Sequence, residues 1–195
     1  MFTVIPCAAG CGRTAITGSK LCAVHMTNPE EEANRIALTI AGTDVVKDLN
    51  APGLRFESVN FGGRQFYGCN FTGASFSMCV FAKSVMRMSF FDFAIFNDCD
   101  FSLSDLQFLS FGGAAIRDCS FENSELVHIN YGGAAIADST FNDSNLYNSR
   151  FINADIIHTD FIDCNLKKTY FIKTRQEGVS FKSSNTAEAV FELGE

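Results

Sequence analysis

The chain has 195 residues, of which 21 are Phe and 3 are Pro, and 47% of the sequence is apolar. This length suits one domain with a sizeable core and a small appendage, and the apolar content excludes a disordered chain. Residues 92–163 carry 12 acidic residues against Arg117 and Arg150, a local net charge of −10 (2 − 12) within a total of −7. Such a surface repels nucleic acid and anionic lipid, so we expect this part of the chain to bind neither DNA nor a membrane.

No apolar run approaches the roughly 20 residues that span a bilayer, and the first residues lack the basic and apolar segments of a signal peptide. We therefore expect a cytoplasmic protein. The chain has 8 Cys. In that compartment we expect them to be reduced thiols or metal ligands and not disulfides.

Four potential metal ligands lie within residues 1–27, as two close pairs. Cys7 and Cys11 form the first pair, and Cys22 and His25 form the second. Three thiolates and one imidazole make the closed tetrahedral set of a structural Zn²⁺ site. The segment resembles small zinc knuckles with a Cys-x-x-His second half that precede some phage-type nuclease domains, although no nuclease motif follows. We expect one structural zinc here; the alternative is a tail with unrelated Cys.

Residues 29–41 are predicted to form a helix that caps the segment after it. Asn28 suits the N-cap, Pro29 suits the first turn, and the acidic residues at 30–32 face the positive end of the helix dipole. Gly42 marks the expected end. We take 28–50 as the helical cap and allow a short second turn within 43–49.

A five-residue period governs the chain from Phe56 to Phe171. Every fifth residue in this range, 24 in all, is apolar, and 19 of the 24 positions two residues earlier are Ala, Ser, Cys or Thr. This period fits neither an α-helix nor a flat strand. A backbone that turns a corner every five residues would place one large and one small side chain of each unit inside a narrow tube.

A period of 20 residues lies on top of the first. Small residues repeat in columns, as at Ala74 and Ala94, and so do large ones, as at Leu106 and Leu126. Four units therefore make one turn of a solenoid, whose successive turns stack about 4.8 Å apart. Five further Cys occupy the small inward sites, where we expect buried free thiols: Cys69, Cys79, Cys99, Cys119 and Cys164.

This pattern resembles the pentapeptide-repeat family, whose consensus is a small residue, Asp or Asn, Leu or Phe, and two polar residues. The resemblance covers about 56–175 and implies an all-β fold, a right-handed quadrilateral parallel β-helix with about six coils of 20 residues. We place the β-helix at 51–185 and a C-terminal tail at 186–195, with the register fraying at Gln176. Three stretches show the match: Ser144-Asn145-Leu146, Ala154-Asp155-Ile156 and Cys164-Asn165-Leu166.

The sequence contains no recognisable catalytic constellation, so we expect a protein that is not an enzyme. His128 and His158 fall at outward positions, and neither has a Ser or Cys partner at a meaningful spacing. Pairs such as Gly112-Gly113 are interpreted as turns, because no helix or Lys-Ser follows them as a phosphate loop requires.

The first candidate interaction surface is acidic. Asp98, Asp118 and Asp138 are 20 residues apart and should stack at one corner, and Asp143 and Asp163 should stack at the next. Like charges this close are mutually unfavourable, so a cation or a basic partner could offset the repulsion. The alternative is a solvated surface that provides solubility.

The second candidate surface is apolar. Met88, Phe90, Phe93 and Phe108 do not fit the inward register and are predicted to lie around one corner. Four contiguous exposed apolar side chains indicate an interface. The alternative is that the N-terminal segment folds back over them.

The leading hypothesis is a non-enzymatic β-helical scaffold that acts through contact with a protein partner or a second copy. The alternative is an acidic DNA mimic, because some quinolone-resistance pentapeptide proteins protect DNA gyrase through an acidic, rod-like dimer. This chain departs from them in having no inserted loop between 56 and 171 and no clear dimerisation helix after Phe171. A nucleic-acid adaptor acting through the zinc knuckle has little basic charge behind it, only Arg13 and Lys20.

Overall fold

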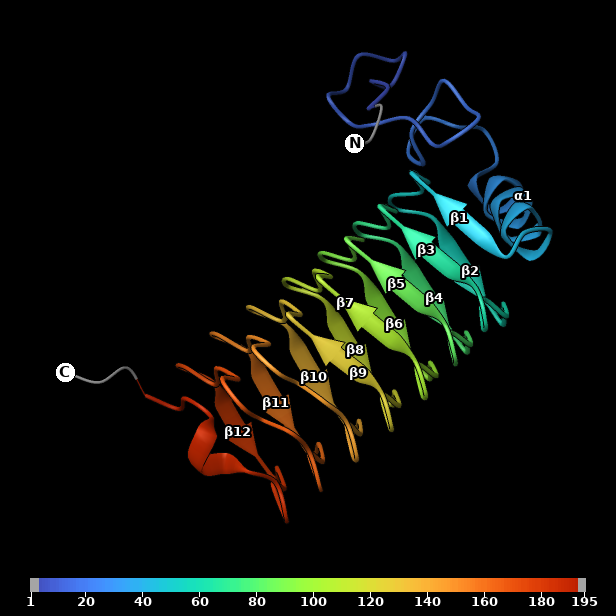
Figure 1. Cartoon of the computed structure of the whole chain (residues 1–195). Helices are drawn as coiled ribbons and strands as arrows, with labels where there is room; N and C mark the ends of the chain where they lie inside the picture. The colour runs from blue at the N-terminus through green and yellow to red at the C-terminus, as the bar shows by residue number, and fades with distance from the viewer. Residues whose placement is uncertain (1–3, 193–195) are drawn as a thin grey trace.

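The computed structural model describes residues 4–192. Residues 1–3 of the predicted Cys/His segment and residues 193–195 of the predicted C-terminal tail lie outside the described residues. One helix is followed by a stack of three-residue strands that runs to the other end of the molecule (Figure 1). The elements are α1 (Pro29–Ala41), β1 (Val45–Lys47), β2 (Arg55–Glu57), β3 (Gln65–Tyr67), β4 (Ser75–Ser77), β5 (Val85–Arg87), β6 (Ile95–Asn97), β7 (Asp105–Gln107), β8 (Ala115–Arg117), β9 (Glu125–Val127), β10 (Ala135–Ala137), β11 (Asp155–Ile157), β12 (Arg175–Glu177) and the 3₁₀ turn η1 (Thr186–Glu188).

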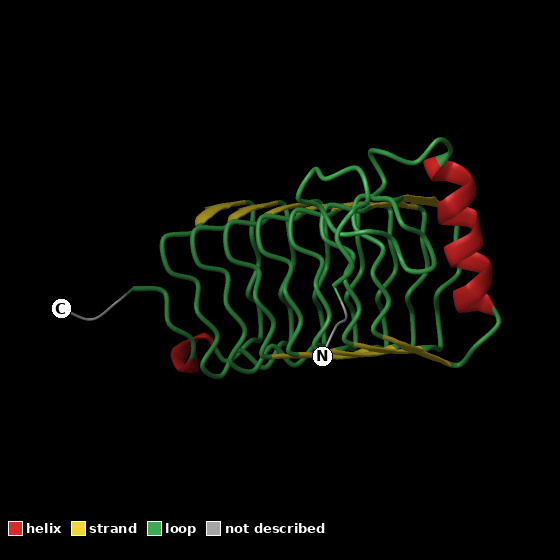
Figure 2. Cartoon of the chain, turned by 90° about the horizontal axis from the view of Figure 1, so that it is seen from above, coloured by secondary structure: helices red, strands yellow, loops and turns green. Residues whose placement is uncertain are grey.

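Helix α1 closes one end of the stack, as Figure 2 shows. The side-chain oxygen of Asn28 accepts a hydrogen bond from the backbone N–H of Glu31 (3.2 Å), which satisfies a donor that a helix start leaves free. At the other end, Arg64 donates its Nε–H to the carbonyl of Ile40 (3.0 Å) and so caps α1 from the first turns of the coil. One helical face is buried: Ala33, Ile36 and Ile40.

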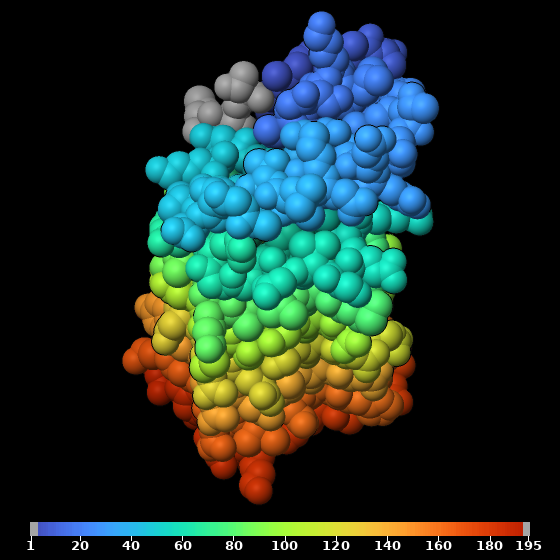
Figure 3. Space-filling model, turned by 90° about the vertical axis from the view of Figure 1, so that its right-hand side faces the viewer, coloured from blue at the N-terminus to red at the C-terminus, as the bar shows by residue number. Residues whose placement is uncertain are grey.

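The strands form two parallel sheets on opposite sides of the coil (Figure 2). One has the order β1-β3-β5-β7-β9 and the other β2-β4-β6-β8-β10-β11-β12. Partners are always one turn apart, as Phe76 and Phe96 are between β4 and β6. Isolated bridges with the same offset join the two remaining sides, as between Phe90 and Ser110. The molecule is therefore a four-sided parallel solenoid, and Figure 3 shows its turns as successive bands in chain order.

The predicted parallel solenoid is confirmed, with corrections to its length. The seven strands of the longer sheet mark about seven turns, not six. The coil begins at β1, inside the 28–50 segment expected to be a cap, and no second helical turn forms within 43–49. The reason is that β-branched Val45 and Val46 favour a strand. Val46, 7% exposed, already fills the large inward site, and the small Ala51 fills the next.

The core consists of the inward side chains of the five-residue units. All 24 positions of the series from Phe56 to Phe171 are buried. Their rings stack in columns, as Phe81 and Phe101 do with centroids 4.6 Å apart and planes at 3°. At the small sites, the Ser104 hydroxyl donates to the carbonyl of Phe81 (3.0 Å) and accepts from the N–H of Ser84 (3.2 Å). One column thus fills the tube while another satisfies buried backbone groups.

Each unit ends at a corner where the backbone adopts positive φ. At Asp98, Asp118 and Asp138 the φ values are 55°, 53° and 51°. Asn, Asp and Gly tolerate this left-handed conformation best, which explains their frequency at the corners. Because the turns are in register, corner residues 20 apart form columns along the surface.

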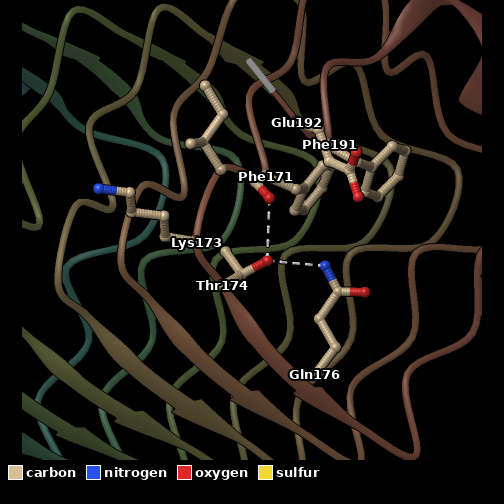
Figure 4. Close-up of a pocket in the computed structure, with 7 residues that line it drawn as sticks. Phe171, Lys173, Thr174, Gln176, Phe191 and Glu192 are labelled. Carbon is tan, nitrogen blue, oxygen red and sulfur yellow. Dashed lines mark hydrogen bonds between the residues drawn. The ribbon is translucent and has the colours of Figure 1, made fainter. Parts of the chain in front are cut away.

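The inward register ends in the last turn. Gln176 of β12 follows Ile156 in its column but is exposed, and its side-chain amide donates to Thr174 (2.9 Å). Phe181 and Phe191 stay in phase, and each stacks on the ring one turn earlier at 5.3 Å. A hollow of about 620 Å³ opens here (Figure 4), lined by Phe171, Ile172, Lys173, Thr174, Gln176, Phe191 and Glu192.

Candidate metal centre and interaction surfaces

The first turn of the N-terminal segment brings Cys7 and Cys11 together. Pro6 and Thr14 form an antiparallel bridge, and inside it the N–H of Gly10 donates to the carbonyl of Cys7 (2.9 Å). Gly10 has φ 70°, a value that favours glycine. The tight loop therefore returns the chain so that Cys11 faces the side from which Cys7 projects.

A second turn carries the other two ligands. The N–H of His25 donates to the carbonyl of Cys22 (3.0 Å), and the N–H of Ala8 donates to the carbonyl of Lys20 (2.9 Å). The second contact holds the two halves of the segment against each other. The predicted ligands are thus assembled from two chelating turns, as their paired spacing suggests.

The four side chains form one cluster whose ligand atoms all lie within 4.8 Å of one another. Cys11 Sγ and Cys22 Sγ are 3.8 Å apart, and His25 Nδ1 lies 3.4 Å from Cys22 Sγ and 3.6 Å from Cys7 Sγ. A tetrahedral Zn²⁺, with Zn–S of about 2.3 Å and Zn–N of about 2.0 Å, requires edges of roughly 3.8 Å and 3.5 Å. The cluster therefore has the dimensions of a closed zinc site.

The environment favours the thiolate at two of these Cys. The backbone N–H of Cys22 donates to the sulfur of Cys7 (3.4 Å), and this bond is the main cause that lowers the pKa of Cys7 to about 6. A backbone hydrogen bond at Arg13 similarly lowers the pKa of Cys11. Burial raises the pKa of Cys22, and a hydrogen bond with Cys7 raises the pKa of His25. At Cys7 and Cys11 the shifts therefore favour the deprotonated form that metal binding needs.

The Cys/His segment is docked on the first turn of the coil. The N–H of Asn50 donates to the hydroxyl of Thr17, and the N–H of Thr17 donates to the carbonyl of Asn50, both at 2.8 Å. Arg35 of α1 donates to the carbonyl of Thr17, and Ile16 belongs to the main core. We call residues 4–27 the Cys3His module.

The predicted acidic columns form. β6, β8 and β10 are neighbours in one sheet, and Asp98, Asp118 and Asp138 each follow one of them. Only Asp138 has ion-pair partners among the described residues: Arg117 (3.0 Å) and His158 (3.6 Å). Asp143 and Asp163 occupy one column at the next corner, where the N–H of each donates to the following turn. We call these five aspartates the acidic columns.

The apolar residues divide between two corners. Met88, Phe90 and Phe108 line one hollow of about 460 Å³ together with Lys47, Asp48, Tyr67 and Gly68. Phe93 does not belong to it, because it lies five residues beyond Met88 and hence one corner further on. The prediction of a single group was wrong for Phe93. Tyr67 and Gly68 were missed, although the 20-residue period places Gly68 in the column of Met88. We call Met88, Phe90 and Phe108 the apolar corner.

The two outward histidines lie in structural contacts. The ring of His128 stacks on Phe108 at 4.8 Å, and its Nδ1 lies 2.7 Å from the side-chain nitrogen of Asn148. His158 faces Asp138. Neither contact includes a nucleophile.

No helix in the described part of the chain is long and apolar enough to cross a membrane.

The fold defines a parallel β-solenoid with four-sided turns of 20 residues. The family model of the pentapeptide repeats matches residues 133–174 with 8 copies. Residues 133–174 therefore consist of pentapeptide repeats, and the resemblance inferred from the sequence is confirmed, with a Cys3His cluster at the N-terminal end. A search of curated proteins with this sequence gives no match.

Several solved structures resemble the chain. The pentapeptide repeat protein Rfr23 from the cyanobacterium Cyanothece 51142 matches with a TM-score of 0.45 and 17% identity, over 47% of this chain and 63% of that one, less than two thirds of its length. A form of QnrB1, a plasmid-mediated fluoroquinolone resistance protein, has a TM-score of 0.42 and 18% identity, over 75% and 71%. HetL from the cyanobacterium Nostoc sp. strain PCC 7120, involved in heterocyst differentiation regulation, has a TM-score of 0.33 and 12% identity, over 80% and 95%.

Proposed function

We propose that the protein is a non-enzymatic scaffold that binds a protein partner or a second copy through the apolar corner. The observation that supports it is that Met88 and Phe108, 60% and 55% exposed, line the same hollow on the surface of the coil. Adjacent exposed apolar side chains on a rigid surface are typical of protein interfaces. Pentapeptide-repeat scaffolds are generally not enzymes, which supports the non-enzymatic part of the proposal.

The test replaces both exposed side chains in the variant Met88→Asp with Phe108→Asp. We expect the mass measured by light scattering, or the affinity for a purified partner, to fall while circular dichroism is unchanged. The matched control is Phe93→Asp at the neighbouring corner, which is 70% exposed and should retain association. Equal behaviour of both variants would contradict a role for the apolar corner.

The Cys3His cluster is proposed to hold one structural Zn²⁺. The spacing of its ligand atoms supports this, because all four positions of a tetrahedral ion would be filled by protein. Purified protein should contain one equivalent of zinc, and Cys22→Ser should lose it, while Cys69→Ser in the coil should keep it. A metal-free protein under reducing conditions would rule the site out.

Loss of the metal should affect the module and not the coil. The coil from 56 to 171 has its own continuous core, so chelation should increase amide exchange in residues 4–27 and leave the strands protected. Simultaneous loss of protection in both parts would show instead that the module is required for the whole fold.

The alternative function is an acidic mimic of DNA that binds a DNA-binding protein such as a topoisomerase. The acidic columns support it, since they repeat negative charge along a rod. QnrB1 is a fluoroquinolone resistance protein, and a similar role here would require protection of gyrase. A supercoiling assay with a fluoroquinolone should then show protection by the wild type and none by the variant with Asn at 98, 118 and 138. Protection by neither protein would exclude this alternative.

A further inference from the structure

A groove lies between the Cys3His module and the first turns of the coil. It encloses about 480 Å³, and its lining includes Arg13 and Val24 from the module and Gly53, Thr72 and Gly73 from the coil. No function described above uses it. The module side of the groove includes Cys22 itself and neighbours of the proposed metal ligands Cys11 and Cys22, such as Gly12 and Ala23.

The groove exists because two corner residues have no side chain. Gly53 and Gly73 occupy a corner column in which Phe93 and Asn153 follow, all with positive φ. A Cβ at Gly73 would meet no atom within 4 Å, so the space beside it is open. The column is filled again at Phe93, whose ring lies 2.8 Å from the point that a Cβ on Gly113 would take. The open stretch is therefore about two turns long, or ~10 Å.

The charge in the groove is positive. Arg13 is the one basic residue of the lining, which contains no Asp or Glu; its side chain also hydrogen-bonds the thiol of Cys11, and no carboxylate of the described chain lies within ion-pair distance of its guanidinium. The hollows on either side contain Glu30 and Glu57 beside Arg55, so a second carboxylate would be less favoured there. An anionic group is thus directed to Arg13, whose planar guanidinium binds a carboxylate through two hydrogen bonds.

The rest of the lining is mostly apolar. Val24, 66% exposed, projects from the module beside Ala23, and Pro52 lies on the coil side. An aliphatic side chain next to a carboxylate would bury its surface here. In an extended peptide about three residues cover the ~10 Å between Gly53 and Phe93. The dimensions therefore match a short extended segment and not a folded domain.

We propose that this groove binds an acidic segment of a partner protein, in which a carboxylate that pairs with Arg13 stands next to an aliphatic residue that packs on Val24. The inference rests on the scaffold function only in that a partner supplies the segment. Since the module wall carries the metal ligands, zinc should order the groove and strengthen binding.

The probe is the acetylated and amidated peptide Glu-Leu-Glu, titrated into ¹⁵N-labelled zinc-loaded protein and followed by amide chemical shifts. We expect saturable shifts at Gly53, Gly73 and Val24, and binding at least roughly tenfold weaker for Gln-Leu-Gln, which lacks the charge-assisted hydrogen bonds. Equal binding of both peptides, or shifts confined to other surfaces, would overturn the proposal.

Matched variants locate the site. Gly73→Asn places a side chain in the groove in a conformation that Asn153 already adopts in the same column, and it should abolish binding. Gly133→Asn makes the same change outside the groove and should not. Arg13→Gln should weaken the binding of Glu-Leu-Glu at least roughly tenfold with zinc content unchanged. Arg55→Gln should leave the affinity for this peptide within about twofold of the wild type. A loss in both members of either pair would contradict the proposal.

The test is independent of the apolar corner. The variant with Asp at 88 and 108 should bind Glu-Leu-Glu as the wild type does. If this variant binds the peptide and still associates as the wild type does, the groove proposal is supported and the proposed role of the apolar corner is contradicted. Chelation of zinc should weaken binding of the peptide at least several-fold. Unchanged affinity would show that the metal does not order the groove.

Discussion

Tyr131 is the one tyrosine in a core column of phenylalanines, stacked between Phe111 and Phe151 at 5.3 and 4.7 Å. Its hydroxyl is buried and has no hydrogen-bond partner among the described residues. An unsatisfied buried hydroxyl destabilises a fold, so Tyr131→Phe should increase the free energy of unfolding by roughly 1 kcal/mol. Urea denaturation measures the change, and Tyr170→Phe at the surface is the control. A destabilised Tyr131→Phe would reveal a partner for the hydroxyl.

The buried thiol of Cys69 should make the free energy of unfolding decrease at alkaline pH. Burial is the main cause that raises the pKa of Cys69 from its ordinary value of 9.0 to about 11. In the unfolded chain this thiol ionises near pH 9 while the folded chain still holds the proton, so the free energy of unfolding should fall as pH rises from about 9 to 11. One such thiol contributes at most roughly 3 kcal/mol. Cys69→Ala should show a shallower decline between pH 8 and 11, and an equal slope would contradict the assignment.

At the scale of elements, the link between the Cys3His module and the coil depends on Asn50. Its side chain donates to Thr14 (3.0 Å) and to the carbonyl of Ala15, in addition to its backbone contacts with Thr17. Asn50→Ala should therefore weaken docking by roughly 1–2 kcal/mol and expose the module to limited proteolysis, with zinc content unchanged. Asn60→Ala is the control, because that side chain bonds only within its own turn. Equal protease resistance would show that the contacts of Thr17 and Ile16 are sufficient to hold the module.

The elements differ in how far the sequence could predict them. The core was predictable because burial in a solenoid depends on position within a five-residue unit, a local property; Phe56 and Phe171 follow the same rule. The ends of α1 were predictable from Asn28 and Gly42 for the same reason. The start of the coil was missed because Val46 and Ala51 are less distinctive than Phe at these sites.

The sites required three-dimensional information to different degrees. The Cys3His cluster was predictable because pairs such as Cys22 and His25 are close in sequence. Phe93 and Phe108 lie at different corners of the coil. Assigning each of them to its corner from the sequence requires the register to be counted residue by residue. The groove at Gly73 could not be predicted, because its second wall belongs to the module, and the docking of one part on another leaves no periodic signal.

At the scale of the whole molecule, the two ends of the solenoid differ. The first turn is covered by α1, whereas the last turn presents Gln176 where an apolar residue is expected. Gln176→Ile should extend the column of Ile156, bury more apolar surface, and increase the free energy of unfolding by roughly 1 kcal/mol. Amide exchange in β12 should slow. Gln65→Ile, an outward position of β3, is the control, and an equal effect there would mean that strand propensity is responsible.

The constant offset of one turn between paired residues has a consequence for how such a chain can change its length. Deleting 20 residues would remove one turn and leave every surface column behind it aligned. Deleting five, for example 121–125, would keep inward residues inward but rotate everything downstream by one side of the square. Asp138 would then leave the column of Asp118 and fall in line with Gly113. Insertions and deletions of five residues can thus bring different surface residues into line on an unchanged core. Changes in chain length by multiples of five residues are therefore a route to new binding specificity.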